Sequence, residues 1–340
     1  MHKEFKEAMG ILDENAKVAI ELQQIPDPDA MASAMYVAHI AERMGYKPTI
    51  THAGKLSHPQ NIVMAKRLDI PLACYGQIDI DPTSFDAFVF VDHSGSTSQW
   101  YREGKIPQDS LVAIIDHHDL DAATPEGVFV DKRKVGSTST ILTEYLQQDA
   151  GDFDDDALEK VATALLLGIR SDTHGLKRNV SELDRDMHHY LLSKANMDLV
   201  DQIEEIDWPA EWMDHYGKAI HNRESKNGVT VASVGCIETG QRDVIPTIAE
   251  HLLYEKGVHT VYVWGLRPDI IDVSIRTRDP TYDFGIIPEK FPEGSGGGKE
   301  GAGGIQIPSP FGEESFVAYD RHSDTIGDVI GQEFRQRLLD

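Results

Sequence analysis

The stretch that decides the fold is residues 111–118, LVAIIDHH, in which five apolar residues run into an acid and two histidines. A short, continuously apolar run predicts a strand that is buried on both faces, as in a parallel sheet. Residues 84–92, SFDAFVFVD, have the same form and also end on an acid. Because ligand groups gather at the carboxyl ends of parallel strands, the sequence predicts a functional site where Asp92 and Asp116 lie.

Strand and helix signals alternate on both sides of these two strands. Further strands are predicted at residues 17–24, 47–51 and, more weakly, 128–130, and helices at residues 30–45, 138–148 and 157–167. This alternation is typical of an α/β fold, with a mostly parallel sheet and helices on both of its faces.

The length of 340 residues favours two domains that share a cleft. We expect a first domain over residues 1–190, a helical linker over 191–225 and a second, smaller α/β domain over 226–340. In the second domain, strands are predicted at residues 229–237, 259–265 and 271–277, and a helix at residues 244–256. The glycine-rich stretch at residues 294–304, GSGGGKEGAGG, predicts a structured loop.

The composition limits the class of partner and the location of the protein. The formal net charge is −25, from 57 acidic and 32 basic residues, which disfavours binding to long duplex nucleic acid. The acidic excess indicates either adaptation to high salt or an ordinary acidic protein. The sequence predicts no membrane span, and its two cysteines predict buried thiols in a reducing compartment. We therefore expect a cytoplasmic protein.

Four acidic motifs follow one another at predicted element ends. They are PDPD at residues 26–29, the acid Asp92, the triplet at residues 116–118, and GIRSDT at residues 168–173 with its acid at a turn. Taken singly, each motif could be a helix cap or an acidic turn. Two adjacent histidines behind an acid indicate one metal ligand and one group that is held by hydrogen bonds.

Together the motifs offer oxygen and nitrogen donors without sulfur. This mixture suits Mn²⁺ or Mg²⁺, with Co²⁺ and Zn²⁺ as alternatives. The predicted donors are Asp27, Asp29, Asp92, His117 and Asp172.

These motifs, in this order, resemble those of the DHH phosphoesterase family. The resemblance also covers GSTST at residues 136–140, and the second half resembles the family's DHH-associated C-terminal domain. The layout is most similar to the nanoRNase/pAp phosphatase branch. Members of that branch hydrolyse very short oligonucleotides and 3′-phosphoadenosine 5′-phosphate (pAp), and relatives act on cyclic dinucleotide products.

The resemblance implies two Mn²⁺ ions, with Mg²⁺ or Co²⁺ as alternatives. Asp27 and Asp92 would hold one ion, and Asp29, Asp92, His117 and Asp172 would hold the other, so that Asp92 bridges the two. His118 would face the substrate phosphate, and we assign it to catalysis together with Asp116.

Two positions depart from the family pattern. Gln23 stands where the family has a histidine ligand of the first ion, and we expect it to be a weak ligand. Lys299 stands where the family's glycine loop has histidine. In the second domain, substrate binding is predicted for Arg276, Lys299, Gly296, Gly297 and Gly298, with Arg178 of the first domain as a further candidate.

We therefore expect a metal-dependent phosphoesterase that acts on short oligonucleotides, pAp or linear or cyclic dinucleotides. Its partner would be a small phosphorylated nucleotide or short single-stranded oligonucleotide, with neither long duplex nucleic acid nor a membrane. Two alternatives stay open: a catalytically weakened nucleotide-binding or regulatory protein, and an inorganic pyrophosphatase. The sequence also leaves open whether the protein is a homodimer.

Overall fold

The computed structural model describes residues 1–118, 126–299, 301–309 and 325–339. It divides into two compact units, Met1–Ile206 and Asp207–Asp340. The division falls inside the stretch that the sequence predicted as a linker. Helix α8 (Met197–Glu204) contributes to the core of the first unit and α9 (Ala210–Asn222) to the core of the second. These two helices are therefore parts of the units, because their apolar faces are buried there.

The first unit contains a six-stranded sheet in the order β3-β2-β1-β4-β5-β6, and every neighbouring pair is parallel. The strands are β1 (Lys17–Glu21), β2 (Lys47–His52), β3 (Leu72–Cys74), β4 (Ala87–Val91), β5 (Leu111–Asp116) and β6 (Phe129–Lys132). The predicted α/β class is thereby confirmed. The strand order switches between β1 and β4: from β1 the chain adds β2 and β3 on one side, and it then adds β4, β5 and β6 on the other. Open α/β sheets bind ligands in the crevice at such a switch point.

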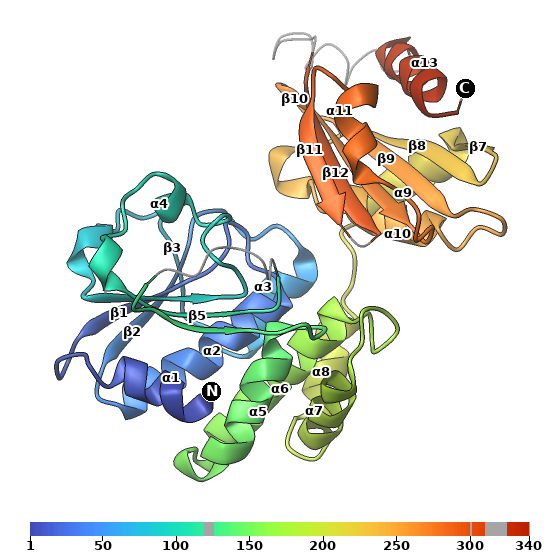
Figure 1. The fold of residues 1–340 in the computed structure, drawn as a ribbon. Helices are drawn as coiled ribbons and strands as arrows, with labels where there is room; N and C mark the ends of the chain where they lie inside the picture. Colours follow the sequence, from blue (N-terminus) through green and yellow to red (C-terminus); the bar gives the residue numbers. More distant parts are fainter. Residues whose placement is uncertain (119–125, 300, 310–324, 340) are drawn as a thin grey trace. The chain divides into compact units, whose positions relative to one another are not determined.

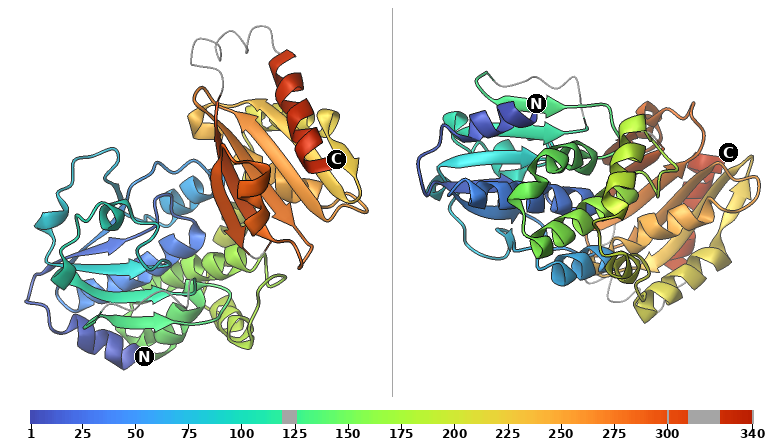
Figure 2. Two further views of the ribbon diagram at one scale, coloured as in Figure 1. Left: turned by 45° about the horizontal axis from the view of Figure 1, so that its top comes forward. Right: turned by 90° about the horizontal axis from the view of Figure 1, so that it is seen from below.

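Helices cover the sheet unequally, as Figures 1 and 2 show. The larger core lies under helices α1 (His2–Met9), α2 (Pro28–Arg43), α3 (Pro59–Arg67), α5 (Thr138–Asp149), α6 (Asp155–Asp172), α7 (Glu182–Leu192) and α8. On the other face, Phe88, Phe90 and Ile114 pack against Trp100 of the short helix α4 (Gln99–Arg102) and against loops. The side chains of β4 alternate between the two cores, as the pleat of a strand requires.

The second unit contains a mixed sheet in the order β11-β12-β10-β9-β8-β7. The strands are β7 (Glu224–Lys226), β8 (Val229–Cys236), β9 (Thr260–Leu266), β10 (Ile270–Thr277), β11 (Ser295–Lys299) and β12 (Ala302–Pro308). One face packs on α9 and α10 (Val244–Leu252), and the other packs on α11 (Ile287–Lys290) and α13 (Thr325–Leu339). Helix α10 thus ends four residues earlier than predicted.

The glycine-rich stretch is a β-hairpin, which corrects the prediction of a loop. Strands β11 and β12 pair antiparallel, with Gly298 opposite Gly303. A Cβ atom added to Gly298 would lie 2.5 Å from the Phe284 ring, and one added to Gly303 would lie 2.4 Å from the same ring. Glycine is therefore required because the ring packs directly on the hairpin backbone.

Two smaller observations complete the fold. Cys74 and Cys236 lie in different units and form no disulfide, and both are half-buried where buried thiols were predicted. Among the residues that the structure describes, none of the helices combines the length and the apolar character needed to span a membrane.

Candidate metal centre

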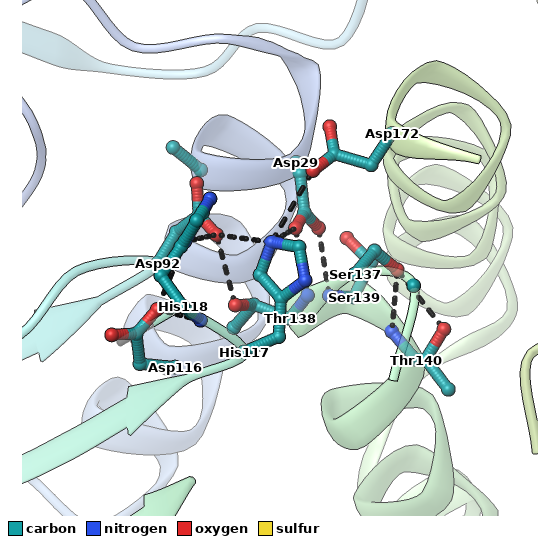
Figure 3. Close-up of polar contacts among 12 residues, drawn as sticks. Asp29, Asp92, Asp116, His117, His118, Ser137, Thr138, Ser139, Thr140 and Asp172 are labelled. Carbon is teal, nitrogen blue, oxygen red and sulfur yellow. Dashed lines mark hydrogen bonds and ion pairs between the residues drawn. The ribbon is translucent and has the colours of Figure 1, made fainter. Parts of the chain in front are cut away.

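The predicted acids and histidines of the first unit converge at the carboxyl ends of β1, β4 and β5 (Figure 3). Asp92 follows β4, and Asp116 ends β5 with His117 directly after it. Asp27 and Asp29 begin α2, at the point where the sheet order reverses. Asp29 and Asp172, which are 143 positions apart in the sequence, therefore have ligand atoms in one cluster.

Asp29 is fully buried, and backbone groups hold both of its oxygens. The N–H of Thr138 donates to Oδ2 and that of Ser139 to Oδ1, each at 2.7 Å. These N–H groups belong to the first turn of α5, where the helix dipole favours a negative charge. The carboxylate is thereby fixed in one orientation before any ion binds.

Asp92 is buried and its backbone has a positive φ of 63°. Its Oδ1 accepts a hydrogen bond from Thr138 Oγ1 at 2.9 Å, whereas Oδ2 is buried and has no hydrogen-bond partner among the described residues. Burial, followed by the charges of Asp29 and Asp27, raises the pKa of Asp92 well above its usual range. A buried carboxylate oxygen without a partner is costly, and a bound cation would remove that cost.

His117 points its Nε2 atom into the same cluster. Its Nδ1 lies 3.2 Å from the Val135 carbonyl oxygen, which fixes the proton on Nδ1 in the neutral ring. Within the part of the chain that the structure describes, Nε2 is buried without a hydrogen bond, at 3.3 Å from Asp172 Oδ2 and 3.5 Å from Asp92 Oδ1. Burial acts to lower the pKa of His117, but Asp172 and Asp29 outweigh it and raise the pKa to about 9.

These donors fit a divalent cation. Two overlapping groups of side chains have ligand atoms within 4.8 Å of one another, and both contain His117. One group adds Asp92 and His118, and the other adds Asp29 and Asp172. Carboxylate oxygens and imidazole nitrogen are suitable ligands for Mn²⁺, Mg²⁺ or Co²⁺. The unpartnered atoms Asp92 Oδ2 and His117 Nε2 are the positions where such an ion would satisfy buried groups.

Asp116 and His118 form a pair at the edge of the cluster. His118 Nδ1 lies 3.0 Å from Asp116 Oδ1, and its backbone N–H donates to the same oxygen at 2.9 Å. Ser94 Oγ donates to the other oxygen at 2.7 Å. Burial acts to raise the pKa of Asp116, but these hydrogen bonds lower it to about 2. Asp116 is therefore an anion that orients the half-exposed ring of His118.

Asp27 and Gln23 contact each other at the margin of the site. Asp27 caps α2 by accepting from the Ala30 N–H at 2.9 Å, and its Oδ2 accepts from Gln23 Nε2, also at 2.9 Å. Burial, followed by Asp29, raises the pKa of Asp27. Gln23 thus contacts the carboxylate with its amide nitrogen, which is not a metal donor atom. Its predicted role as a weak ligand stays a prediction.

Asp172 lies in the last turn of α6, which corrects the predicted loop after residue 167. Helix α6 packs along α2 and α5, and its buried residues continue through Gly168 and Ile169. A Cβ atom on Gly168 would lie 2.2 Å from Ser139 Oγ and 3.1 Å from the Cα of Asp29. This glycine lets three helices approach, so that Asp172 reaches His117. Burial raises the pKa of Asp172 to about 7.

His93, directly after Asp92, is not available to take the place of the histidine ligand that Gln23 replaces, because both of its ring nitrogens are engaged. The ring is buried, with Nε2 2.9 Å from the Glu21 carbonyl oxygen, while Nδ1 accepts from the Gly95 N–H at 2.9 Å. Burial lowers the pKa of His93 to about 4. The ring anchors the chain that follows Asp92 to strand β1.

Glu21, at the end of β1, is a buried acid that sequence reasoning did not find. Its carboxyl accepts hydrogen bonds from Thr51 Oγ1 at 2.6 Å, Ser98 Oγ at 2.7 Å and the Tyr75 hydroxyl at 2.9 Å. The only sequence signal was a charged residue inside an apolar strand. Although these donors oppose the effect, burial raises the pKa of Glu21 to about 7.

This raised pKa predicts a pH-dependent stability that Glu21→Gln should remove. The folded carboxyl holds its proton more tightly than the unfolded one, so the protein loses stability as pH rises from about 4.5 to about 7. The loss is at most about 1.4 kcal/mol per pH unit. Glutamine can accept from Tyr75 and Ser98 and donate to Thr51. Urea unfolding in EDTA should show the variant gaining on the wild type from pH 5 to pH 8. A constant difference would contradict the prediction.

The predicted substrate residues of the second unit lie on β10 and β11. The guanidinium of Arg276 donates to Glu250 Oε1 and to Ser274 Oγ, each at 2.9 Å. A Cβ atom on Gly297 would meet nothing within 4 Å, so the backbone is open there, whereas Gly296 and Gly298 pack closely. The backbone of Lys299 pairs with Ala302, and its side chain lies outside the described residues. Arg178 belongs to the first unit and is half-buried.

Comparison with known proteins defines the class of the first unit. Residues 17–169 match the DHH family, N-terminal domain. The first unit therefore carries a DHH family domain, and the predicted motifs 26–29, 92 and 116–118 lie inside it.

Two curated relatives come from Methanocaldococcus jannaschii. One is an uncharacterized protein, 35% identical over 285 residues, which are 83% of this chain and 56% of the relative. The other is a manganese-dependent inorganic pyrophosphatase, 27% identical over 187 residues, which are 52% of this chain and 55% of the relative. The chain thus spans a little over half the length of the curated relatives that it matches.

Two solved structures share the fold. An exopolyphosphatase-related protein from Bacteroides fragilis superposes with a TM-score of 0.73 at 16% identity, over 97% of each chain. The exonuclease RecJ bound to manganese superposes with a TM-score of 0.52 at 12% identity, over 96% of this chain and 93% of the other. Both structures therefore share the α/β fold of this chain.

Proposed function

We propose that the protein is a divalent-metal-dependent phosphoesterase, with Mn²⁺ as the preferred ion. The observation that carries the proposal is a pair of buried atoms that have no hydrogen-bond partner among the described residues, Asp92 Oδ2 and His117 Nε2, on side chains that belong to a cluster of acids. A buried site with this many like charges and two unsatisfied donor atoms is suited to a cation. The relation to a manganese-dependent pyrophosphatase supports the choice of ion.

In this proposal, different side chains bind the metal and contact the substrate phosphate. Asp29, Asp92, His117 and Asp172 would hold the metal, and Asp27 would contribute to a second ion. When bound, divalent ions of this kind polarise the phosphoryl group and lower the pKa of the attacking water. His118, which Asp116 orients, would face the substrate phosphate as a hydrogen-bond donor.

The proposed substrates are pAp, short oligonucleotides, and linear or cyclic dinucleotides. Arg276 and the open backbone at Gly297 would bind a second phosphate of the substrate. An inorganic pyrophosphatase is the second candidate, because one relative carries that activity. Arg276 supports the nucleotide proposal, since a pyrophosphate held entirely in the metal centre does not require it.

The test is a substrate screen under defined metal conditions. Purified protein would be incubated with Mn²⁺, Mg²⁺, Co²⁺ or EDTA and with each proposed substrate or pyrophosphate. Hydrolysis of a nucleotide that requires added metal supports the proposal. Turnover of pyrophosphate alone supports the second candidate, and a substrate that binds without turnover identifies a binding protein.

Arg276→Ala should raise the KM for the best nucleotide and lower kcat/KM by about 10- to 100-fold, because a charged hydrogen bond to phosphate is lost. Mn²⁺ affinity, measured by calorimetry, should not change. Arg223→Ala is a matched control, because Arg223 pairs with Glu255 at 2.8 Å in the same unit. Equal losses of kcat/KM in both variants would contradict the assignment of Arg276 to the substrate site.

A further inference from the structure

The loop at residues 135–139 contacts three of the proposed metal ligands. The Val135 carbonyl oxygen lies 3.2 Å from His117 Nδ1, and Thr138 Oγ1 donates to Asp92 at 2.9 Å. The N–H groups of Thr138 and Ser139 donate to Asp29. Residues 135–137 lead into α5, which begins at Thr138, and we call residues 135–139 together the cap loop. A shift of the cap loop would therefore move the supports of all three ligands together.

Asp184 also holds the cap loop, through groups other than those that bind Asp29. It is fully buried in the first turn of α7, and the Gly136 N–H lies 2.9 Å from both of its oxygens. Thr140 Oγ1 donates to Oδ1 at 2.5 Å. The backbone N–H and the hydroxyl of Ser181 both donate to Oδ2 at 2.6 Å. One carboxylate thus joins the N-terminus of α7 to that of α5.

The space around Gly136 supports the same role for Asp184. A Cβ atom on Gly136 would lie 3.0 Å from Asp184 Oδ2 and 2.5 Å from Cγ2 of Thr173, the residue after Asp172. Glycine therefore allows the cap loop to sit between Asp184 and the end of α6. The loop is enclosed by groups on several sides and has little freedom to move.

We propose that Asp184 is a positioning residue for the metal centre, which it controls through the cap loop. The inference rests on the proposed metal site. Within the described residues, Asp184 hydrogen-bonds to none of the proposed ligands, and it acts on Asp29, Asp92 and His117 through the backbone between Val135 and Ser139. Outer contacts of this kind set the orientation of metal ligands and change affinity by about 10- to 100-fold.

Each described hydrogen bond to the Asp184 carboxylate comes from an N–H or hydroxyl donor, which makes Asp184→Asn an informative change. An asparagine of the same shape offers one oxygen, and its NH₂ group would face an N–H or a hydroxyl. The cap loop should shift, and the dissociation constant for Mn²⁺ should rise by about 10- to 100-fold. Calorimetry on metal-free protein measures this constant independently of activity.

Asp149→Asn is the matched control. Asp149 is a buried acid at the opposite end of α5, roughly 17 Å along the helix axis, and it accepts from His2, Lys6 and Tyr36. This variant should lower the melting temperature and leave the Mn²⁺ dissociation constant unchanged. The pair separates positioning of the metal ligands from general loosening of the helix.

Each outcome decides a different question. Weak Mn²⁺ binding in Asp184→Asn alone supports the inference, whereas equal weakening in both variants, or none in Asp184→Asn, overturns it. If wild-type protein binds no divalent ion, the proposed metal site itself fails. If Asp184→Asn does not fold, Thr140→Val removes one donor to Asp184 and should still raise the dissociation constant several-fold. An unchanged constant in that variant would overturn the inference.

Discussion

Replacement of Asp92 by alanine is expected to abolish tight Mn²⁺ binding and nearly all hydrolysis. Asp92 lies beside both histidines, with its Oδ1 3.5 Å from His117 Nε2 and 3.5 Å from His118 Nδ1. The loss should exceed the roughly 10- to 100-fold effect of removing an outer contact, because a ligand itself is lost. Calorimetry and turnover of the best substrate would measure it.

A second substitution at this position separates charge from shape. Asp92→Asn keeps the volume, and asparagine tolerates the positive φ of 63°. In EDTA this variant should unfold at a higher temperature than wild type, because a buried carboxylate among like charges is removed. It should nevertheless bind Mn²⁺ weakly.

Asp86→Ala, at the exposed start of the same strand, is the control for both changes. It should leave metal binding intact. Wild-type Mn²⁺ affinity in either Asp92 variant would exclude Asp92 from the metal centre.

Gly168→Val is expected to destabilise the first unit by about 3 kcal/mol and to weaken metal binding. Even a Cβ atom would lie 2.2 Å from Ser139 Oγ and 3.0 Å from its Cβ, so α6 must move away from α5 and α2. Overpacking of this kind costs about 1–3 kcal/mol, and a β-branched residue inside a helix adds to it. Urea unfolding would measure the change.

The control for Gly168→Val is a helical glycine without neighbours. A Cβ atom on Gly217, within α9, would meet nothing within 4 Å. Gly217→Ala should therefore stabilise the protein by about 0.4–1 kcal/mol, through the lower entropy of the unfolded chain. Unfolding of Gly168→Val at the wild-type urea concentration would show that the three helices can separate without cost.

The sequence was sufficient for the parts of the fold that depend on local pattern. Strand β5 has the predicted bounds because a continuous apolar run ends sharply at Asp116. Asp172 was predicted to lie on a turn, whereas it lies in the last turn of α6. Helix α6 extends this far where it packs closely against α2 and α5, and that tertiary contact leaves no local sequence signal. The hairpin β11–β12 was missed for a related reason, since a run of glycines signals a loop until a ring such as Phe284 packs on it.

The supports of the candidate site were less visible in the sequence than its acids. Aspartates at strand ends are a recognisable signal, so the cluster of Asp29, Asp92, His117 and Asp172 was expected before its geometry was known. Glu21 and Asp184 are buried acids whose partners are hydroxyl and N–H donors from distant segments. Their roles arise from tertiary contacts, and an acid inside a strand or near a helix start does not reveal them.

The two buried carboxylates of the centre differ in how readily mutation can disturb them. The donors to Asp29 are main-chain N–H groups, which every residue except proline supplies. Positions 138 and 139 can therefore vary widely without turning this carboxylate. Asp92 instead accepts from a hydroxyl, which a single substitution at Thr138 removes. The orientation of Asp29 is thus insensitive to substitution of its neighbours, whereas the hydrogen bond to Asp92 can be removed by one side-chain change.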